Sequence, residues 1–313
     1  MSAAAANAAT HAAVLERLDP ALTGVVPLTL PAALPAGPLT VELVRRVDAS
    51  LVSEPVETAR VVRIGRTDGS ALELRLHETE RADAAILWIH GGGMFLGSAR
   101  QDDALCRSLS SALGTTVVAV DYRLAPEHPH PAPLEDCYTA LDWLAHRYPR
   151  VVVAGGSAGG GLAAGLALLA RDRSRPAIAG LHLSYPMLDD RESPMITSEL
   201  ADTVVWNARL DALAWEAYLG GSPADQYAAP GRAADLSGLP PTVIDAGDLD
   251  LFVHEDIAFA AALEAAGVDV TLTVETGAPH CFEFILPDTD RSRATLERKH
   301  AALAGLLDGG AAR

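Results

Sequence analysis

The chain is short of positive charge and of long apolar runs. Its 313 residues carry 41 acidic against 24 basic side chains, and the net charge of -17 disfavours binding to nucleic acid and to anionic membrane surfaces. No apolar run approaches the length of a membrane span. We therefore expect a globular protein with neither a nucleic-acid nor a membrane partner.

Cysteine and lysine are also scarce. Cys106, Cys137 and Cys281 are an odd set without metal-ligand spacing, which predicts reduced thiols and no metal site. Lys299 is the sole lysine, a bias typical of GC-rich genomes from which we draw no functional inference. Residues 1–13 are rich in alanine but lack the basic start of a secretory signal, which predicts a cytoplasmic protein.

Hydrophobic residues make up 49% of the chain, enough for a sizeable core, and they occur in short runs. These runs alternate with helix-length segments, and this alternation predicts an α/β fold with a mostly parallel sheet flanked by helices on both faces. The predicted strands are 84–89, 116–120, 151–154, 180–183, 242–245 and 268–274, and the predicted helices are 102–113, 134–148, 158–171, 254–266 and 291–307.

Other segments fall outside this alternation. Residues 56–64 and 72–77 flank a Thr67-Asp68-Gly69 turn, as in an antiparallel hairpin at a sheet edge. The proline-containing stretch 20–38 predicts loop. We expect one domain over 1–313, with a cap formed by about 1–50 and 193–221.

Ser157 lies in a Gly-Gly-Ser-Ala-Gly pentapeptide between an apolar strand and an Ala/Leu-rich helix. A serine on so sharp a turn is held in a strained backbone conformation that small neighbours tolerate, and its hydroxyl projects from the sheet. The Ala158 N–H, at the start of the helix, can face an oxyanion. The pattern alone also fits a phosphate-binding turn or a merely tight turn.

A second motif, His90-Gly91-Gly92-Gly93, ends the predicted strand 84–89. Consecutive glycines let backbone N–H groups approach a ligand closely. In acyl transfer, the N–H groups of Gly91, Gly92 and Gly93 would form an oxyanion hole jointly with that of Ala158. The alternative is a flexible glycine loop, and His90 is expected to fix the loop rather than to act in catalysis.

These motifs together resemble the hormone-sensitive-lipase-like α/β-hydrolases, which in bacteria are mostly carboxylesterases. The His-Gly-Gly-Gly loop is similar to one family motif, and residues 121–129, Asp-Tyr-Arg-Leu-Ala-Pro-Glu-His-Pro, are similar to another. Residues 185–191 and 215–220 resemble further landmarks, so the likeness covers roughly residues 61–286. It implies the α/β-hydrolase fold with a helical cap, and a small-molecule ester as substrate with no cofactor.

The resemblance also implies a triad in the order Ser, Asp or Glu, His. His280, in the loop after the last predicted strand, matches the family histidine and is expected to be the general base and acid. Three carboxylates, Asp245, Asp248 and Asp250, follow strand 242–245. The family spacing favours Asp250 as the residue that orients the imidazole, with Asp248 as the competitor.

Two positions depart from the family pattern. Gly156 stands where the two large subgroups have Asp or Thr before the serine. The subgroup of this chain therefore stays open, and so does a homodimer contact that depends on this residue. Cys281 follows His280 where glycine is common, and is expected to pack and to confer sensitivity to alkylating reagents. Glu127 and Asp136 are expected to organise loops beneath the site.

We therefore predict a serine carboxylesterase that acts on short- to medium-chain acyl esters through an acyl-enzyme. An amidase or formamidase would use the same triad, so this alternative stays open. The other alternative is a non-catalytic ligand-binding protein, which the presence of His280 disfavours.

Overall fold

The computed structural model describes residues 11–28, 41–42, 44–45, 59–80, 83–191 and 203–309. Its centre is an eight-stranded sheet with the order β1-β2-β4-β3-β5-β6-β7-β8. The strands are β1 (Arg60–Gly65), β2 (Ala71–His77), β3 (Ala84–Ile89), β4 (Thr116–Asp121), β5 (Arg150–Gly156), β6 (Gly180–Ser184), β7 (Thr242–Gly247) and β8 (Val270–Glu275). This sheet confirms the predicted α/β architecture.

Strand direction follows the sequence pattern. β1 pairs antiparallel with β2, and β2 pairs antiparallel with β4, which confirms the edge hairpin. The other neighbours pair in parallel. Every residue of β3 is buried, as expected of a parallel strand covered on both faces. Of the predicted hairpin strand 56–64, residues 56–58 lie outside the described residues.

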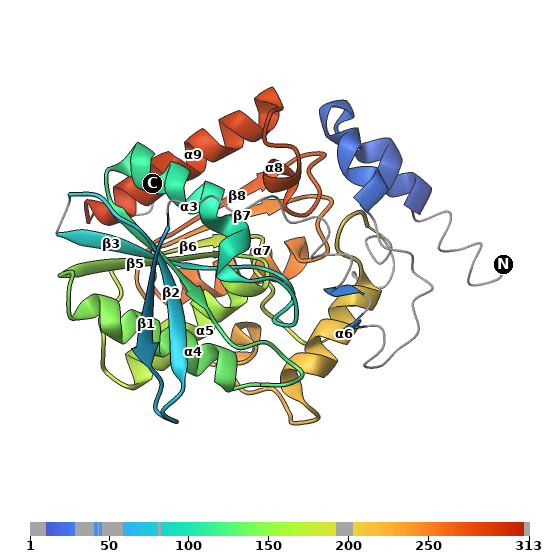
Figure 1. Cartoon of the computed structure of the whole chain (residues 1–313). Coiled ribbons are helices and arrows are strands. Elements are labelled where there is room, and N and C mark those ends of the chain that lie inside the picture. Colours follow the sequence, from blue (N-terminus) through green and yellow to red (C-terminus); the bar gives the residue numbers. More distant parts are fainter. Residues whose placement is uncertain are drawn as a thin grey trace.

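Helices cover both faces of the sheet (Figure 1). α3 (Asp103–Leu113) and α9 (Asp290–Leu307) pack on one face, against side chains such as Ile86 and Trp88 of β3. α4 (Ala132–Ala145), α5 (Ala158–Asp172) and α7 (Val253–Ala265) pack on the opposite face, against side chains such as Leu87 and Ile89. The alternating inward and outward positions of each strand thus supply two apolar cores.

Residues 11–17, 41–42 and 44–45 are helical, and short helices and α6 are the other elements of the described chain. They are η1 (Pro20–Leu28), η2 (Ala99–Asp102), α6 (Ala208–Leu219), η3 (Pro230–Arg232) and α8 (Phe282–Ile285). The loop expected over 20–38 is therefore wrong for residues 20–28, which form a 3-10 helix, because Leu22 and Val25 point into the core. Residues 29–38 lie outside the described residues.

The two segments predicted to form a cap are only partly described. Of 1–50, the structure describes 11–28, 41–42 and 44–45, and of 193–221 it describes 203–221. Residues 11–28 lie beside α8 in Figure 1. The Asp19 N–H donates to Gly277 O over 3.0 Å, which ties this segment to the loop that carries His280.

Candidate active site

Ser157 occupies the turn between β5 and α5. Its backbone has φ = 57° and ψ = -125°, which is a strained conformation for a residue with a side chain. The Ser157 N–H donates to Ser184 O on the neighbouring strand β6 over 2.9 Å. The strained turn is thus anchored to the sheet, as the sequence motif predicts.

Gly155 and Gly159 let this turn lie against the sheet. A Cβ at Gly159 would stand 2.0 Å from Ile89 O and 2.6 Å from His90 O, and a Cβ at Gly155 would stand 2.4 Å from Gly159 O. All three distances are far below van der Waals contact. The glycines are therefore required by the close approach of α5 to the end of β3.

His280 and Asp250 come next to Ser157 although they lie far away in the sequence. His280 Nε2 is 3.0 Å from Ser157 Oγ, and His280 Nδ1 is 2.7 Å from Asp250 Oδ2. The three residues are 7%, 3% and 0% exposed, in the order Ser157, His280, Asp250. Since a carboxylate can only accept, Nδ1 carries a proton and Nε2 is left to accept the proton of the serine hydroxyl.

The other two carboxylates of the β7 loop have different partners. Asp248 Oδ1 accepts the Gly277 N–H over 2.7 Å and so shapes the loop before His280. Asp245 Oδ2 lies 3.1 Å from Nε2 of His182. Asp250 is therefore the one of the three that contacts His280, whereas Asp248, the sequence competitor, supports the loop.

Aromatic rings hold the imidazole of His280 in place. The ring of Tyr185 meets it edge-on with centroids 4.8 Å apart, and Phe252 does so at 5.4 Å. Tyr185 is fixed in turn, because its hydroxyl donates to Glu283 Oε1 over 2.9 Å, and Glu283 pairs with the buried Lys299. Sequence reasoning missed this support, since no local pattern links these positions.

The glycine loop approaches the serine. A Cβ on Gly91 would stand 3.3 Å from Ser157 Cβ, and both Gly91 and Gly92 line the pocket beside Ser157. Gly92 has φ = 111°, which an L side chain rarely adopts. Gly93 lies farther toward the 203–219 segment, where its Cβ would stand 2.6 Å from Trp206 Cη2.

Ala158 completes the set of residues expected to hold an oxyanion. It is the first residue of α5, so its N–H has no carbonyl partner within the helix. Of the four positions singled out, Gly91, Gly92 and Ala158 therefore adjoin Ser157, whereas Gly93 adjoins Trp206.

His90 has the supporting position expected of it. Its Nδ1 lies 2.8 Å from Gly91 O, and its ring stacks on Tyr122 with centroids 4.1 Å apart. Burial lowers the pKa of His90 to about 4, so this imidazole is neutral at physiological pH and donates from Nδ1 to the carbonyl. The ring thus fixes the glycine loop by hydrogen bonding and stacking.

Carboxylates of the 121–136 region hold loops by ion pairs. Asp136 is 1% exposed and accepts from Arg123 Nε over 2.9 Å and from Arg66 Nε over 2.8 Å. Glu127 accepts from Arg45 Nη1 over 2.7 Å, and this interaction lowers the pKa of Glu127 to about 2. The expectation that Glu127 and Asp136 organise loops is confirmed.

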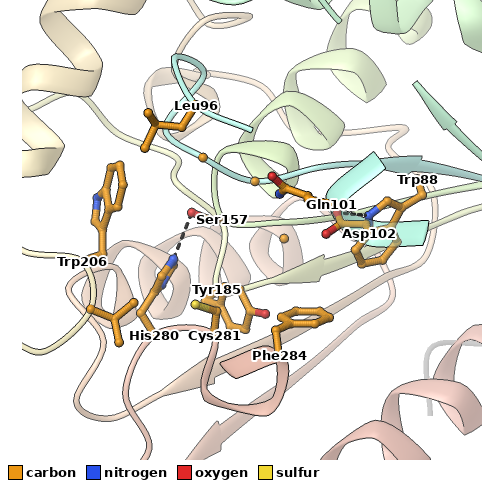
Figure 2. Close-up of a pocket in the computed structure, with 14 residues that line it drawn as sticks. Trp88, Leu96, Gln101, Asp102, Ser157, Tyr185, Trp206, His280, Cys281 and Phe284 are labelled. Atoms are coloured by element: carbon orange, nitrogen blue, oxygen red, sulfur yellow. Dashed lines mark hydrogen bonds between the residues drawn. The ribbon is translucent and has the colours of Figure 1, made fainter. Parts of the chain in front are cut away.

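Ser157 opens into a pocket of about 230 Å³. Figure 2 shows Trp206 and Leu96 on one side of the serine and Trp88, Gln101 and Asp102 on the other. The remaining wall is formed by Gly91, Gly92, Gly156, Tyr185, Val205, His280, Cys281 and Phe284. Sequence reasoning placed Asp102 merely at the start of a helix and missed its position in this pocket.

Metal-binding clusters and membrane-spanning helices are two further structural features that indicate function. Among the described residues, no group of three or more His, Cys, Asp or Glu side chains is arranged to hold a metal ion. No helix in the described part of the chain has the length and apolar character needed to cross a membrane.

Comparison with known proteins agrees with this geometry. A family model described as the α/β-hydrolase fold matches residues 86–284, which include Ser157, Asp250 and His280. The chain belongs to the α/β-hydrolase family. The resemblance to its hormone-sensitive-lipase-like branch, inferred from the motifs, is confirmed.

Relatives of this α/β-hydrolase are named as esterases. It is 38% identical over 205 residues to the esterase LipI of Mycobacterium tuberculosis, a match covering 61% of this chain and 63% of that protein, just under two thirds of its length. It is 36% identical over 235 residues to the carboxylesterase NlhH of Mycobacterium tuberculosis, covering 68% of this chain and 73% of that protein.

A solved structure titled as a bacterial heroin esterase is similar over nearly the whole α/β-hydrolase chain. Its TM-score is 0.84 with 32% sequence identity, and the match covers 93% of this chain and 98% of that chain. Hydrolysis of carboxylic esters is the activity that these relatives support.

Proposed function

We propose that this α/β-hydrolase is a serine carboxylesterase in which Ser157 is the nucleophile, His280 the general base and acid, and Asp250 the residue that orients the imidazole. The observation that carries the proposal is the continuous hydrogen-bonded chain from Ser157 Oγ through His280 to Asp250, with distances of 3.0 Å and 2.7 Å. Such a chain is the arrangement that activates a serine hydroxyl.

The reaction has two halves. Ser157 Oγ attacks the ester carbonyl while His280 Nε2 takes its proton, and Asp250 stabilises the imidazolium that forms. The imidazolium then protonates the leaving alcohol, and an acyl-enzyme remains. Water, deprotonated by the same nitrogen, attacks the acyl carbon, and His280 returns the proton to Ser157 as the acid leaves.

The oxyanion of each tetrahedral intermediate needs donors that point at it. In this proposal the N–H groups of Gly91, Gly92 and Ala158 supply them, whereas Gly93, which adjoins Trp206, supports the loop that carries the first two. Each such donor contributes about 3 to 4 kcal/mol to transition-state stabilisation. The closeness of Gly91 to Ser157, with a virtual Cβ contact of 3.3 Å, supports this role.

Substrate size follows from the pocket and its cover. A volume of about 230 Å³ is smaller than the roughly 300 Å³ at which drug-sized ligand sites begin, which favours short acyl chains over long ones. We propose that the segments about 1–50 and 193–221 form the cap that limits this space. Val205 and Trp206, which line the pocket, support that role for the second segment.

A series of p-nitrophenyl esters from acetate upward tests this function, with native protein beside Ser157→Ala. We expect turnover to be highest for short acyl chains and to be lost in the variant, while circular dichroism shows both proteins folded. Turnover of p-nitroanilides in preference to esters would replace the esterase with an amidase. Binding without turnover of either series would indicate a ligand-binding protein, and the proposal would fail. Cytoplasmic location and homodimerisation stay predictions.

A further inference from the structure

One side of the pocket carries a carboxylate that the proposed reaction does not use. Asp102, the last residue of η2, lines the pocket together with Ser157. Trp88 Nε1 donates to Asp102 Oδ2 over 2.7 Å, and Gln101 lines the pocket beside it. Figure 2 shows these three side chains on the side of Ser157 opposite Trp206.

Asp102 differs from its neighbour Asp103 in how its charge is balanced. Asp103 accepts from Arg75 Nε over 2.8 Å and is thus paired with a guanidinium. The groups that act on Asp102 are the neutral donors Trp88 and Gln101 and the negative Asp103, with no cation of the described chain among them. A partly buried carboxylate without a counter-charge is costly, and a cation that enters the pocket would offset that cost.

The walls near Asp102 are aromatic. Trp88, Tyr185 and Phe284 line the same pocket, and aromatic faces attract alkylammonium groups. Lys299 Nζ lies 4.7 Å from the centre of the Tyr185 ring, but Glu283 balances its charge. Lys299 therefore does not neutralise Asp102. The end of the pocket at Asp102 keeps its negative charge and is lined by aromatic rings.

We propose that Asp102, with the aromatic rings beside it, selects esters that carry a cationic amine a few bonds from the scissile carbonyl. The inference rests on the proposed esterase function, since it assigns the substrate class of the same pocket. Asp102 acts in binding and takes no part in the bond changes at Ser157. The Trp88 indole and the Gln101 amide are neutral donors, so they orient the carboxylate without balancing its charge, and that charge is left to attract the ammonium group.

The protonation of Asp102 supports this assignment. Burial raises the pKa of Asp102 to about 6, so the carboxylate is mainly ionised at pH 7 to 8 and becomes neutral below pH 6. Selectivity for a cation should therefore fall as the pH is lowered from 8 to 5. The titratable groups that interact electrostatically with Asp102 are those of Asp103, Cys106, Tyr122, Tyr185 and Cys281. A pH effect on the catalytic steps that the two esters share acts on both alike, so a ratio of rates cancels it.

Matched esters test the proposal. One pair is trimethylammonioethyl acetate and its tert-butyl isostere, in which carbon replaces the ammonium nitrogen, and the cation stands on the alcohol side. The second pair is the ethyl ester of trimethylammoniobutyrate and its tert-butyl isostere, with the cation on the acyl side. For each pair the readout is the ratio of kcat/KM for the cationic ester to that for the neutral one.

The variant is Asp102→Asn, which removes the charge and keeps an oxygen for the Trp88 indole. The control is Glu264→Gln, which removes one charge from an exposed position of α7 outside the pocket. We expect wild type to favour the cationic ester in at least one pair, and Asp102→Asn to lower that ratio by about tenfold, because the Coulomb attraction between the carboxylate and the quaternary ammonium is lost. Glu264→Gln should leave the ratio unchanged.

A binding measurement separates this inference from the proposed function. Calorimetric titration of the same esters into Ser157→Ala, with and without Asp102→Asn, needs no turnover. Ester hydrolysis whose cationic preference is absent or survives Asp102→Asn overturns the inference and leaves the esterase intact. Absence of turnover together with Asp102-dependent binding of the cationic esters overturns the esterase and supports the binding role. Absence of both overturns both.

Discussion

The glycines around Ser157 offer a matched pair of substitutions with opposite expected results. Alanine at Gly159 would place its Cβ 2.0 Å from Ile89 O, whereas ordinary contact begins at 3.4 Å. α5 would have to move away from β3 by about 1 Å, and overpacking of this severity costs about 3 kcal/mol. Alanine at Gly156 meets Tyr185 Cε2 at 3.4 Å, and Gly156 does not have a positive φ.

For an α/β domain of this size, about 3 kcal/mol lowers Tm by about 5 °C. We expect Gly159→Ala to show this loss and Gly156→Ala to stay within about 1 kcal/mol of wild type. Calorimetry and circular dichroism measure Tm, and kcat/KM on p-nitrophenyl acetate is measured well below it. Gly159→Ala should also lose activity, since His90 O, 2.6 Å from the new Cβ, belongs to the loop beside Ser157. Equal Tm values for the two variants would refute this account of the motif.

Three further predictions concern single side chains. Asp250→Asn should lower kcat about ten-thousandfold, because the amide favours the wrong imidazole tautomer of His280. Asp248→Asn can still accept the Gly277 N–H, so its kcat should stay within a few-fold of wild type. Equal losses of kcat in the two variants would contradict the triad. Burial raises the pKa of Asp211 to about 7, so the folded state binds more protons than the unfolded state between pH 4 and 7, and its stability falls as the pH rises. Asp211→Asn should therefore raise Tm at pH 8 and change it little at pH 4, and a uniform shift would argue against the raised pKa. Burial also raises the pKa of the Cys281 thiol, so iodoacetamide should inactivate the enzyme slowly, and an ester bound in the pocket should protect it. Cys281→Ala should resist inactivation by iodoacetamide. Rapid inactivation of that variant would place the reactive group elsewhere.

The parts of the site that were predictable are those that a continuous stretch of sequence encodes. Strand, glycine turn and helix follow one another around Ser157, so the local pattern sufficed for its position. The glycine loop at Gly91 and Gly92 was predictable for the same reason. Both stretches owe their shape to glycines that allow close approach of backbone groups, and glycine is visible in the sequence.

The distant partners needed more than local pattern. Asp248 and Asp250 stand two residues apart after the same strand, so composition could not separate them. The path of the loop decides, because Asp248 turns to the Gly277 N–H while Asp250 turns to His280. The family spacing selected Asp250, and the geometry agrees with it.

The polar side of the pocket could not be predicted. Trp88 and Asp102 come from β3 and η2, and they meet only because η2 folds back over the end of the strand. The pairing of Glu283 with Lys299 likewise depends on how α8 packs against α9. Such contacts join side chains of unrelated local patterns, and the fold alone brings them together.

Lys299 has a practical consequence for measuring the enzyme. Activated esters acylate lysine amines without any catalysis, and this background usually obscures active-site titration. Here the sole lysine of the sequence is 6% exposed and held by Glu283, so no lysine amine is open to the reagent. A gain of one acyl mass on the folded protein, absent from Ser157→Ala, would therefore count working active sites directly.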